Sequence, residues 1–371
     1  MKTVLVTGAS GFIGKNLCAQ LEHEKDIEIL RFTKDNTDDE LRKFIAKADF
    51  VFHFAGVNRP KDESEFDDGN RSLTADILDA LQASGSKASF LLTSSTQASL
   101  DNPYGKSKKA AEDAVFGWAK TTGLTAYVYR LPNVFGKWCK PNYNSVVATF
   151  CYNIANGLGV TINDPETTLP LVYIDDVIGE FIKALKGEAP VPVDSFYRIP
   201  RNFKVTLRDL VAKLQIFKDI RKSLLVPDFE NVFDKFLYAT YTSYFDEKEF
   251  DYDLEMKQDE RGWLAEFIKS KQTGQLFVSR TKPGFSRGNH WHHTKIEKFL
   301  VIEGEAEISL RNLNSEDVIA YKVNGDKLQV VDIPAGYVHS IKNIGKADLL
   351  TLIWADEIFD PQQPDTYYLE V

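Results

Sequence analysis

Along residues 1–136, short apolar runs alternate with longer amphipathic segments. Uninterrupted apolar runs are typical of parallel strands buried on both faces, and a period of 3.6 residues is typical of the helices that connect them. The pattern predicts an α/β fold with a doubly wound parallel sheet. The expected strands are 3–7, 27–32, 49–56, 89–95 and 126–136, and the expected helices are 12–22, 38–47, 70–84 and 104–120.

The pattern changes twice in the rest of the chain. Residues 141–243 are irregular, with helices expected at 174–186 and 207–217, and an elaboration that follows a sheet of this kind usually builds the substrate pocket. After an acidic stretch at 246–262, strands separated by Gly and Asn turns follow without a helix, which predicts an all-β barrel or sandwich. We therefore expect two domains, 1–245 and 255–371.

Composition limits the class of protein. The 371 residues are 43% hydrophobic and 27% charged, the profile of a soluble globular protein. A net charge of −9 without any basic run argues against a nucleic-acid partner. Cys18, Cys139 and Cys151 form no CxxC pair, which fits a reducing cytoplasm. No apolar stretch reaches about 18 residues, so no membrane span is expected.

Three glycines, Gly8, Gly11 and Gly14, lie between the first expected strand and its helix. Glycine lets the backbone turn tightly and approach a pyrophosphate, whose charge the helix N-terminus stabilises. Ser10 lies among them and is a candidate donor to a phosphate. The other interpretation is that the glycines only permit close strand–helix packing, but their position after the first strand favours a dinucleotide-binding loop.

The end of the second expected strand indicates which dinucleotide binds. A carboxylate there would accept the ribose hydroxyls of NAD, whereas an arginine would meet the extra phosphate of NADP. This chain has Arg31 there, with Lys34 close behind. We therefore expect NADPH, the alternative being a solvated arginine at the strand end.

A tyrosine and a lysine lie one helical turn apart, so Tyr104 and Lys108 share one helix face. A nearby ammonium favours the tyrosinate and lowers the pKa of the phenol, which lets the tyrosine work as acid or base near neutral pH. Ser94, Ser95 and Thr96 end the preceding strand and can hold a substrate oxygen from the other side. A tyrosine and a lysine at this spacing are common by chance. The catalytic interpretation therefore depends on their occurrence together with the glycine loop and the run of hydroxyl residues.

Together these motifs resemble the extended branch of the short-chain dehydrogenase/reductase family, which has a Rossmann-type sheet and acts on nucleotide sugars. The resemblance implies that Ser95 holds the substrate oxygen, that Tyr104 is the acid, and that Lys108 also binds the nicotinamide ribose. It further makes Asn133 a substrate contact. The segments RLPNVFG at 130–136 and YIDDV at 173–177 also match this branch.

Two features depart from the pattern of that branch. Only eight residues separate Ser95 from Tyr104, and Leu169 and Pro170 stand where epimerases of this branch often carry an arginine. The contact to uridine or phosphate is therefore expected from cations elsewhere. The candidates are Lys137, Lys140 and Arg201, while His53 is expected to be a packed strand residue beside the cofactor.

Histidines gather near the start of the all-β part. His290, His292 and His293 are three of the six in the chain, and Glu297 and His339 follow. The period of two along a strand puts His290 and His292 on one side and His293 on the other. Three imidazoles and a carboxylate suit zinc, iron, manganese or nickel better than magnesium or calcium. The alternative is a set of hydrogen-bonded surface histidines.

The segments HWHHTKIE and PAGYVHSIKN resemble the paired motifs of the cupin superfamily, small β-barrels that hold one metal. The resemblance implies His290, His292, Glu297 and His339 as the metal ligands. It leaves the activity open, because cupins include enzymes, metal-free sugar epimerases and storage proteins. A general base in this part also stays open among His292, His293, Tyr337 and Lys295.

An extended reductase followed by a metal-type cupin resembles the CapF family of bacterial capsular polysaccharide enzymes. That resemblance implies two activities: epimerisation at C3 of a UDP-2-acetamido-2,6-dideoxy-hexos-4-ulose by the cupin, and reduction of C4 with NADPH by the first domain. The implied product is UDP-N-acetyl-6-deoxy-L-talosamine, on the route to UDP-N-acetyl-L-fucosamine. Zinc and a homodimer formed through the cupin are implied as well.

Two alternatives stay open. One is a reductase with a single activity, whose cupin is a metal-stabilised oligomerisation module. The other is a non-enzymatic NADPH-binding regulator, against which the intact set of Ser95, Tyr104 and Lys108 speaks.

Overall fold

The computed structural model describes residues 1–58, 60, 62 and 66–371. The chain forms two compact units, one of Met1–Leu214 with Phe236–Phe245 and the other of Gln215–Lys235 with Asp246–Val371. The segment Gln215–Lys235 goes with the second unit because its backbone pairs with a strand there: the amide of Val226 donates to the carbonyl of Lys269 at 2.9 Å. The domain limits 1–245 and 255–371 remain predictions.

The first unit is built on a parallel sheet, as predicted. Its strand order is β2-β1-β3-β4-β5, and the order reverses between β1 and β3. Ligands of open α/β sheets bind beyond the carboxyl ends of the strands at such a reversal. The strands are β1 Lys2–Thr7, β2 Ile27–Phe32, β3 Phe50–His53, β4 Ser89–Ser95 and β5 Ala126–Leu131.

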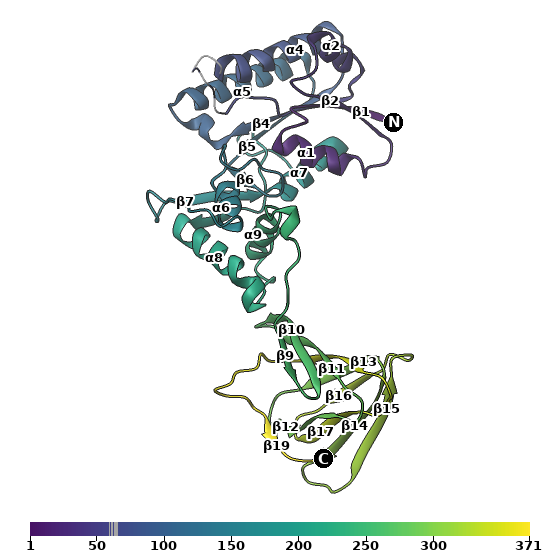
Figure 1. Ribbon diagram of the computed structural model, residues 1–371. Coiled ribbons are helices and arrows are strands. Elements are labelled where there is room, and N and C mark those ends of the chain that lie inside the picture. The colour runs from purple at the N-terminus through teal and green to yellow at the C-terminus, as the bar shows by residue number, and fades with distance from the viewer. Residues whose placement is uncertain (59, 61, 63–65) are drawn as a thin grey trace. The chain divides into compact units, whose positions relative to one another are not determined.

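Helices cover both faces of this sheet (Figure 1). Three lie on one face and bury a core of strand and helix side chains that includes Leu5, Phe90 and Val115, all 0% exposed. Two others pack against each other on the opposite face. The helices of the first face are α2 Asp38–Lys47, α4 Leu73–Ala83 and α5 Pro103–Thr122, and those of the second are α1 Phe12–Leu21 and α7 Ile174–Lys186.

The middle of the chain is more regular than its sequence suggests. The helix expected from residue 70 begins earlier, as a π-helix over Asp67–Ser72. The helix expected at 207–217 is α8, Leu207–Ser223, and extends beyond its expected end. The pattern missed α6 because VVATFCYNIA is apolar almost throughout and shows no clear helical period. The further elements are α6 Val146–Ala155, β6 Asn133–Phe135, β7 Thr168–Tyr173, β8 Phe203–Thr206, α8 Leu207–Ser223 and α9 Val232–Thr242.

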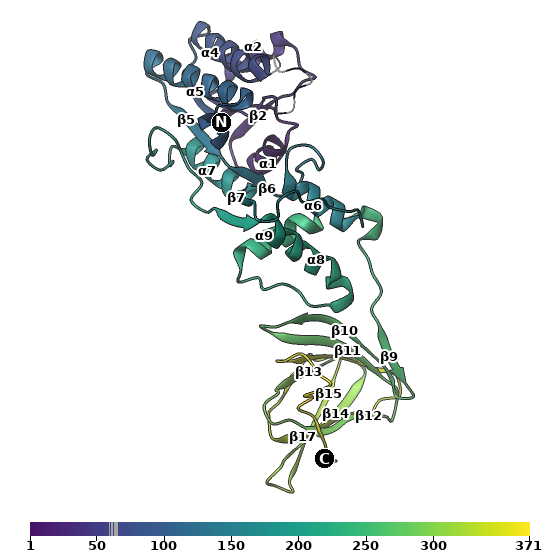
Figure 2. The ribbon, with the colours of Figure 1, turned by 90° about the vertical axis from the view of Figure 1, so that its left-hand side faces the viewer.

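Residues 256–368 of the second unit form antiparallel sheets, as the sequence predicts (Figure 2). One has the order β16-β13-β18-β11-β10-β9 and the other β15-β14-β17-β12-β19. Phe299 and Ile353 of the first sheet share a buried core with Ile308 and Ile341 of the second. The strands are β9 Met256–Asp259, β10 Gly262–Ser270, β11 Gly274–Thr281, β12 Ser286–Trp291, β13 Glu297–Glu303, β14 Glu305–Asn312, β15 Val318–Asn324, β16 Val330–Ile333, β17 Tyr337–Asn343, β18 Leu349–Ala355 and β19 Tyr367–Tyr368.

Two further observations bear on the expectations from composition. Cys18, Cys139 and Cys151 are buried and unpaired. No helix in the described part of the chain has both the length and the apolar character that a membrane crossing requires.

Candidate functional site

The N-terminus of α5 is pressed against the short 3₁₀ turn that follows β4. Asn102 caps the helix by accepting a hydrogen bond from the amide of Gly105 at 2.7 Å. A Cβ on Gly105 would lie 2.3 Å from the carbonyl oxygen of Gln97, so only glycine permits this approach. The contact brings Tyr104 next to Ser95 at the end of β4.

Burial raises the pKa of Tyr104, and a hydrogen bond with Ser95 only partly opposes this. The expected lowering of the phenol pKa by Lys108 is therefore wrong for this structure. The reason is burial, and the Lys108 ammonium donates to the carbonyl oxygen of Thr93, at 3.0 Å. Tyr104 thus stays protonated at neutral pH, the form that a proton donor needs.

Lys108 is 9% exposed, and burial lowers its pKa to about 8, while the charge of Glu112 acts in the opposite direction. Glu112 is fully buried and accepts from Nε and Nη2 of Arg130 at 2.8 and 2.7 Å. It also accepts from the hydroxyl of Ser94 at 2.6 Å. Ser94 is therefore engaged inside the fold, and Thr96 is exposed on the next turn, which leaves Ser95 as the hydroxyl beside Tyr104.

Sequence reasoning missed three residues that hold this site together. Asn70 is 2% exposed and donates to the carbonyl of Val57 at 3.0 Å and to the hydroxyl of Ser107 at 3.1 Å, which ties the loop after β3 to α5. Nothing local in the sequence marks Asn70. Glu112 could have been found from the sequence, because it continues the spacing of four residues from Tyr104 through Lys108. Arg130 is its partner in the structure.

His53 is a packed strand residue, as expected. It is 1% exposed, its Nδ1 lies 2.7 Å from the hydroxyl of Thr7, and its Nε2 lies 3.0 Å from that of Thr74. Burial lowers its pKa to about 3, so the imidazole is neutral at physiological pH.

The backbone of the glycine loop lies so close to neighbouring backbone atoms that side chains would clash there. A Cβ on Gly14 would lie 2.2 Å from the carbonyl oxygen of Gly8, and a Cβ on Gly8 would lie 2.7 Å from the amide nitrogen of Ala55. Close packing alone thus requires both glycines. The feature that suits a phosphate is the start of α1: Gly11 is the N-cap and supplies no side-chain cap, and Ser10 beside it is exposed.

The residues expected to choose the dinucleotide lie at the surface. Arg31 forms an ion pair with Glu22 at 2.5 Å, with its side chain 44% exposed, and Lys34 is exposed. An exposed pair contributes little free energy, so Arg31 can exchange Glu22 for a phosphate.

The substrate candidates of the first unit all carry contacts already. Asn133 donates to the carbonyl of Pro170 at 3.3 Å. Lys137 pairs with Asp175 at 2.7 Å, and Arg201 pairs with Asp176 at 3.3 Å. Both acidic partners begin α7, so the YIDDV segment partly neutralises the cations expected to meet the nucleotide.

The second unit brings His290, His292, Glu297 and His339 together, and their ligand atoms lie within 4.8 Å of one another. A β-bulge produces this arrangement. Gly288 pairs with Ser340 but His290 pairs with His339, so Asn289, at φ +59°, is the extra residue in β12. The cross-strand pair places the rings of His290 and His339 4.6 Å apart.

The chemistry of these four side chains suits a divalent cation. The Nε2 atoms of His292 and His339 are buried and make no hydrogen bond in the described part of the chain, while lying 3.6 and 3.1 Å from Oε2 of Glu297. Burial lowers the pKa of His290 to about 4; burial raises that of Glu297, but the neighbouring His292 and His339 outweigh this and hold it at about 2. Neutral imidazoles and an ionised carboxylate are the forms that bind metal.

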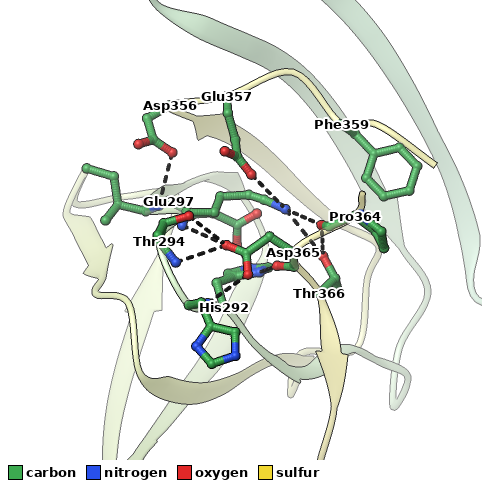
Figure 3. A network of polar contacts seen from close by, with 12 residues as sticks. His292, Thr294, Glu297, Asp356, Glu357, Phe359, Pro364, Asp365 and Thr366 are labelled. Carbon is green, nitrogen blue, oxygen red and sulfur yellow. Dashed lines mark hydrogen bonds and ion pairs between the residues drawn. The ribbon is translucent and has the colours of Figure 1, made fainter. Parts of the chain in front are cut away.

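The candidates for a general base have different surroundings. His293 lies outside the cluster and is exposed, with its ring 4.5 Å from that of Trp291. The Nζ of Lys295 donates to the carbonyl of Pro364 at 2.9 Å (Figure 3). Tyr337 packs against the core, and His292 belongs to the cluster itself. The identity of the base stays open among them.

Comparison with protein families gives the class of this protein. The family model described as "NAD dependent epimerase/dehydratase family" matches residues 4–196, and the one described as "Polysaccharide biosynthesis C-terminal domain" matches residues 257–367. The chain belongs to the NAD-dependent epimerase/dehydratase family.

Individual relatives narrow this class. UDP-2-acetamido-2,6-beta-L-arabino-hexul-4-ose reductase of Pseudomonas aeruginosa is 41% identical over 99% of this chain and 98% of its own length. The crystal structure of the capsular polysaccharide assembling protein CapF of Staphylococcus aureus is 48% identical, covers 99% of this chain and 100% of its own, and superposes with a TM-score of 0.93. RMD of Pseudomonas aeruginosa, solved with NADPH, is 25% identical, covers 59% of this chain and 84% of its own, and has a TM-score of 0.52. The resemblance to CapF enzymes is thereby confirmed.

Removal of one ligand tests the metal cluster. We expect chelator-treated protein to bind one equivalent of Zn²⁺ and, at free metal 100 times the Kd, to gain about 2.7 kcal/mol in free energy of unfolding. His339→Asn should abolish both effects, because it removes a fully buried ligand. His293→Asn, next to the cluster but outside it, should retain both. Equal binding by these two variants, measured by calorimetry, would place the metal elsewhere.

Proposed function

We propose that this chain is a bifunctional nucleotide-sugar enzyme of capsular polysaccharide synthesis. Its second unit would epimerise C3 of a UDP-2-acetamido-2,6-dideoxy-hexos-4-ulose, and its first unit would reduce the 4-keto group with NADPH. The product would be UDP-N-acetyl-6-deoxy-L-talosamine, a precursor of UDP-N-acetyl-L-fucosamine. The observation that carries the proposal is the presence, on one chain, of a Tyr104–Ser95–Lys108 site and a four-ligand cluster.

In the first unit the proposed reaction needs a hydride and a proton. NADPH, held by the loop from Gly8 to Gly14 with its extra phosphate near Arg31, would supply the hydride. Tyr104 holds the proton at its phenol oxygen, because burial keeps its pKa raised. Ser95 lies beside it and would orient the substrate oxygen. Lys108, held on the carbonyl of Thr93, would help to bind the nicotinamide ribose.

In the second unit the proposed reaction needs an acidified C–H bond beside the ketone. A divalent cation, most simply zinc, held by the four-residue cluster would supply positive charge for the oxygen that becomes an enolate. The protein's own part is to keep His290 neutral and Glu297 ionised in a largely buried site. It would also provide a base that takes the C3 proton, and a proton that returns to the opposite face of C3 would complete the inversion.

The two reactions depend on each other chemically. Inversion at C3 is reversible as long as the ketone persists, because only the ketone acidifies the neighbouring C–H bond. Reduction at C4 removes the ketone and fixes the new configuration. The alternative is a reductase with a single activity, in which the second unit serves only oligomerisation and metal-dependent stability.

A homodimer through the second unit is supported by an exposed apolar edge. β15 and β16 are edge strands of the two sheets, and Ile319 and Val330 on them are 47% and 56% exposed. Unpaired strand edges that carry apolar side chains favour strand-to-strand association. A second copy of this chain, presenting the same edge by symmetry, is the partner we propose.

Isotope exchange tests the epimerase. Incubated with the 4-keto substrate in deuterated water without NADPH, the wild-type protein should place deuterium at C3, detected by mass spectrometry and NMR. Glu297→Gln should lose this exchange and still reduce the C3-inverted ketone when it is supplied. Tyr104→Phe should show the reverse, retaining exchange and losing about 10²–10⁴-fold in reduction rate.

The outcomes separate the two functions. Absence of deuterium with NADPH oxidation intact would favour the single-activity reductase. Exchange that survives Glu297→Gln but not Tyr104→Phe would assign the exchange to the first unit and contradict an epimerase in the second.

Coenzyme choice rests on Arg31. Arg31→Ala should raise KM for NADPH at least tenfold, since a charge-assisted hydrogen bond contributes about 1.5–3 kcal/mol, and should leave KM for NADH unchanged. Arg42→Ala, an exposed arginine on α2, serves as the matched control and should change neither. A parallel rise for both coenzymes would show that Arg31 does not contact the extra phosphate.

The dimer is tested at β15. Ile319→Lys puts a charge on the apolar edge and should shift the sedimentation coefficient from dimer to monomer. Val191→Lys, at a position 88% exposed in the first unit, should leave the dimer intact. A wild-type chain that sediments as a monomer at micromolar concentration would disprove this association.

A further inference from the structure

The segment that contains β19 lies against β12, the strand that carries His290 and directly precedes His292. β19 pairs with β12 so that Trp291 faces Tyr367 and His290 faces Tyr368. The rings of Trp291 and Tyr367 stack with centroids 4.9 Å apart, and the amide of Leu369 donates to the carbonyl of Asn289 at 3.1 Å. A segment more than 70 residues beyond β12 in sequence therefore forms one wall beside the cluster.

Asp365 lies at the start of this wall and holds the turn that joins His292 to β13. Its carboxylate accepts hydrogen bonds from the amides of His293, Thr294 and Lys295 at 2.9, 2.9 and 3.0 Å (Figure 3). It also accepts from the hydroxyl of Thr294 at 3.1 Å. One side chain thus satisfies three successive backbone donors between the second and third cluster residues, His292 and Glu297.

The backbone of Asp365 contacts a cluster histidine directly. Its carbonyl oxygen lies 2.6 Å from Nδ1 of His292, which must carry the proton because a carbonyl only accepts. In a neutral His292 the lone pair is then on Nε2, a buried atom that lies 3.6 Å from Oε2 of Glu297 and has no hydrogen-bond partner within the described part of the chain. Such a contact fixes both the tautomer and the ring orientation of a metal-binding histidine.

The residues on either side of Asp365 also bind the turn between His292 and β13. The Nζ of Lys295, a side chain 3% exposed, donates to the carbonyl of Pro364 at 2.9 Å and to the hydroxyl of Thr366 at 3.3 Å. Asp365 itself has φ +35°, a conformation that side chains other than glycine rarely adopt. A strained backbone persists only where its surroundings hold it, and here these hydrogen bonds do so.

We infer that Asp365 is a positioning residue for the proposed metal centre: its carbonyl sets the tautomer and direction of His292, and its carboxylate fixes the turn between His292 and Glu297. This inference rests on the proposed metal site. Asp365 lies outside both histidine motifs. The inference gives this segment control over the affinity of the site for the metal and over the coordination geometry. Loss of an outer partner of this kind typically weakens metal binding about 10–100-fold.

Co²⁺ is the probe, because its visible absorption reports the coordination geometry. Full-length wild type, Asp365→Ala, Asp365→Asn and the control Asp326→Asn would be stripped with chelator and titrated with Co²⁺, with affinity measured by competition. Asp326 is exposed on the turn after β15, away from the cluster residues in sequence, which makes it a matched Asp→Asn change. Near-ultraviolet circular dichroism would confirm that each variant is folded before titration.

We expect wild type and Asp326→Asn to bind one Co²⁺ with the same affinity and spectrum. Asp365→Ala should bind at least tenfold more weakly with shifted absorption bands. Asp365→Asn should fall between them, because an amide keeps one acceptor oxygen but places an NH₂ group among N–H donors. If Asp365→Ala does not fold, the Co²⁺ affinity and the absorption spectrum of Asp365→Asn test the inference instead.

Two results would overturn the inference, and they are distinguishable. Folded Asp365 variants with wild-type affinity and spectrum would show that the C-terminal wall is only structural, with the metal centre intact. Failure of the wild type to bind Co²⁺ would remove the metal site itself and the positioning role with it.

Discussion

A polar group taken out of water must find a partner, and this constraint organises both sites. Around Tyr104, in the first unit, neighbouring protein groups supply these partners. Lys108 donates to the carbonyl of Thr93, and Glu112 accepts from Arg130 and Ser94. In the second unit, the Nε2 atoms of His292 and His339 have no hydrogen-bond partner among the residues that the structure describes. The polar groups beside Tyr104 are therefore paired within the protein, whereas the second site has side chains that could hold a cation.

The two sites also differ in how the chain positions them. Tyr104 and Ser95 meet through a local contact, since a Cβ on Gly105 would lie 2.3 Å from the carbonyl of Gln97 and only a glycine fits. The four-residue cluster is assembled instead from separate strands, with His290 opposite His339 across a bulged pair. Its geometry accordingly depends on the register of a whole sheet and on the C-terminal segment beside it.

This difference suits the chemistry proposed for each unit. Reduction requires a proton donor whose protonation state is set by burial, and a helix face supplies it with few residues. Epimerisation beside a ketone requires neutral imidazoles and an ionised carboxylate held close together, which only a water-excluding interior maintains. Under the proposed function, combining the two on one chain would couple a reversible inversion to a step that removes the acidifying ketone.

The sequence by itself determined the parallel sheet, the all-β second part and the four residues of the cluster, because each leaves a periodic or spaced pattern along the chain. It did not determine that Tyr104 has a raised pKa, since that depends on how deeply the folded chain buries the phenol. Nor did it reveal Asn70 or Asp365, whose partners lie far away in sequence. Only the tertiary structure decides such contacts, because hydrogen bonds between distant segments form once the chain has buried its polar groups and leave no local period to detect.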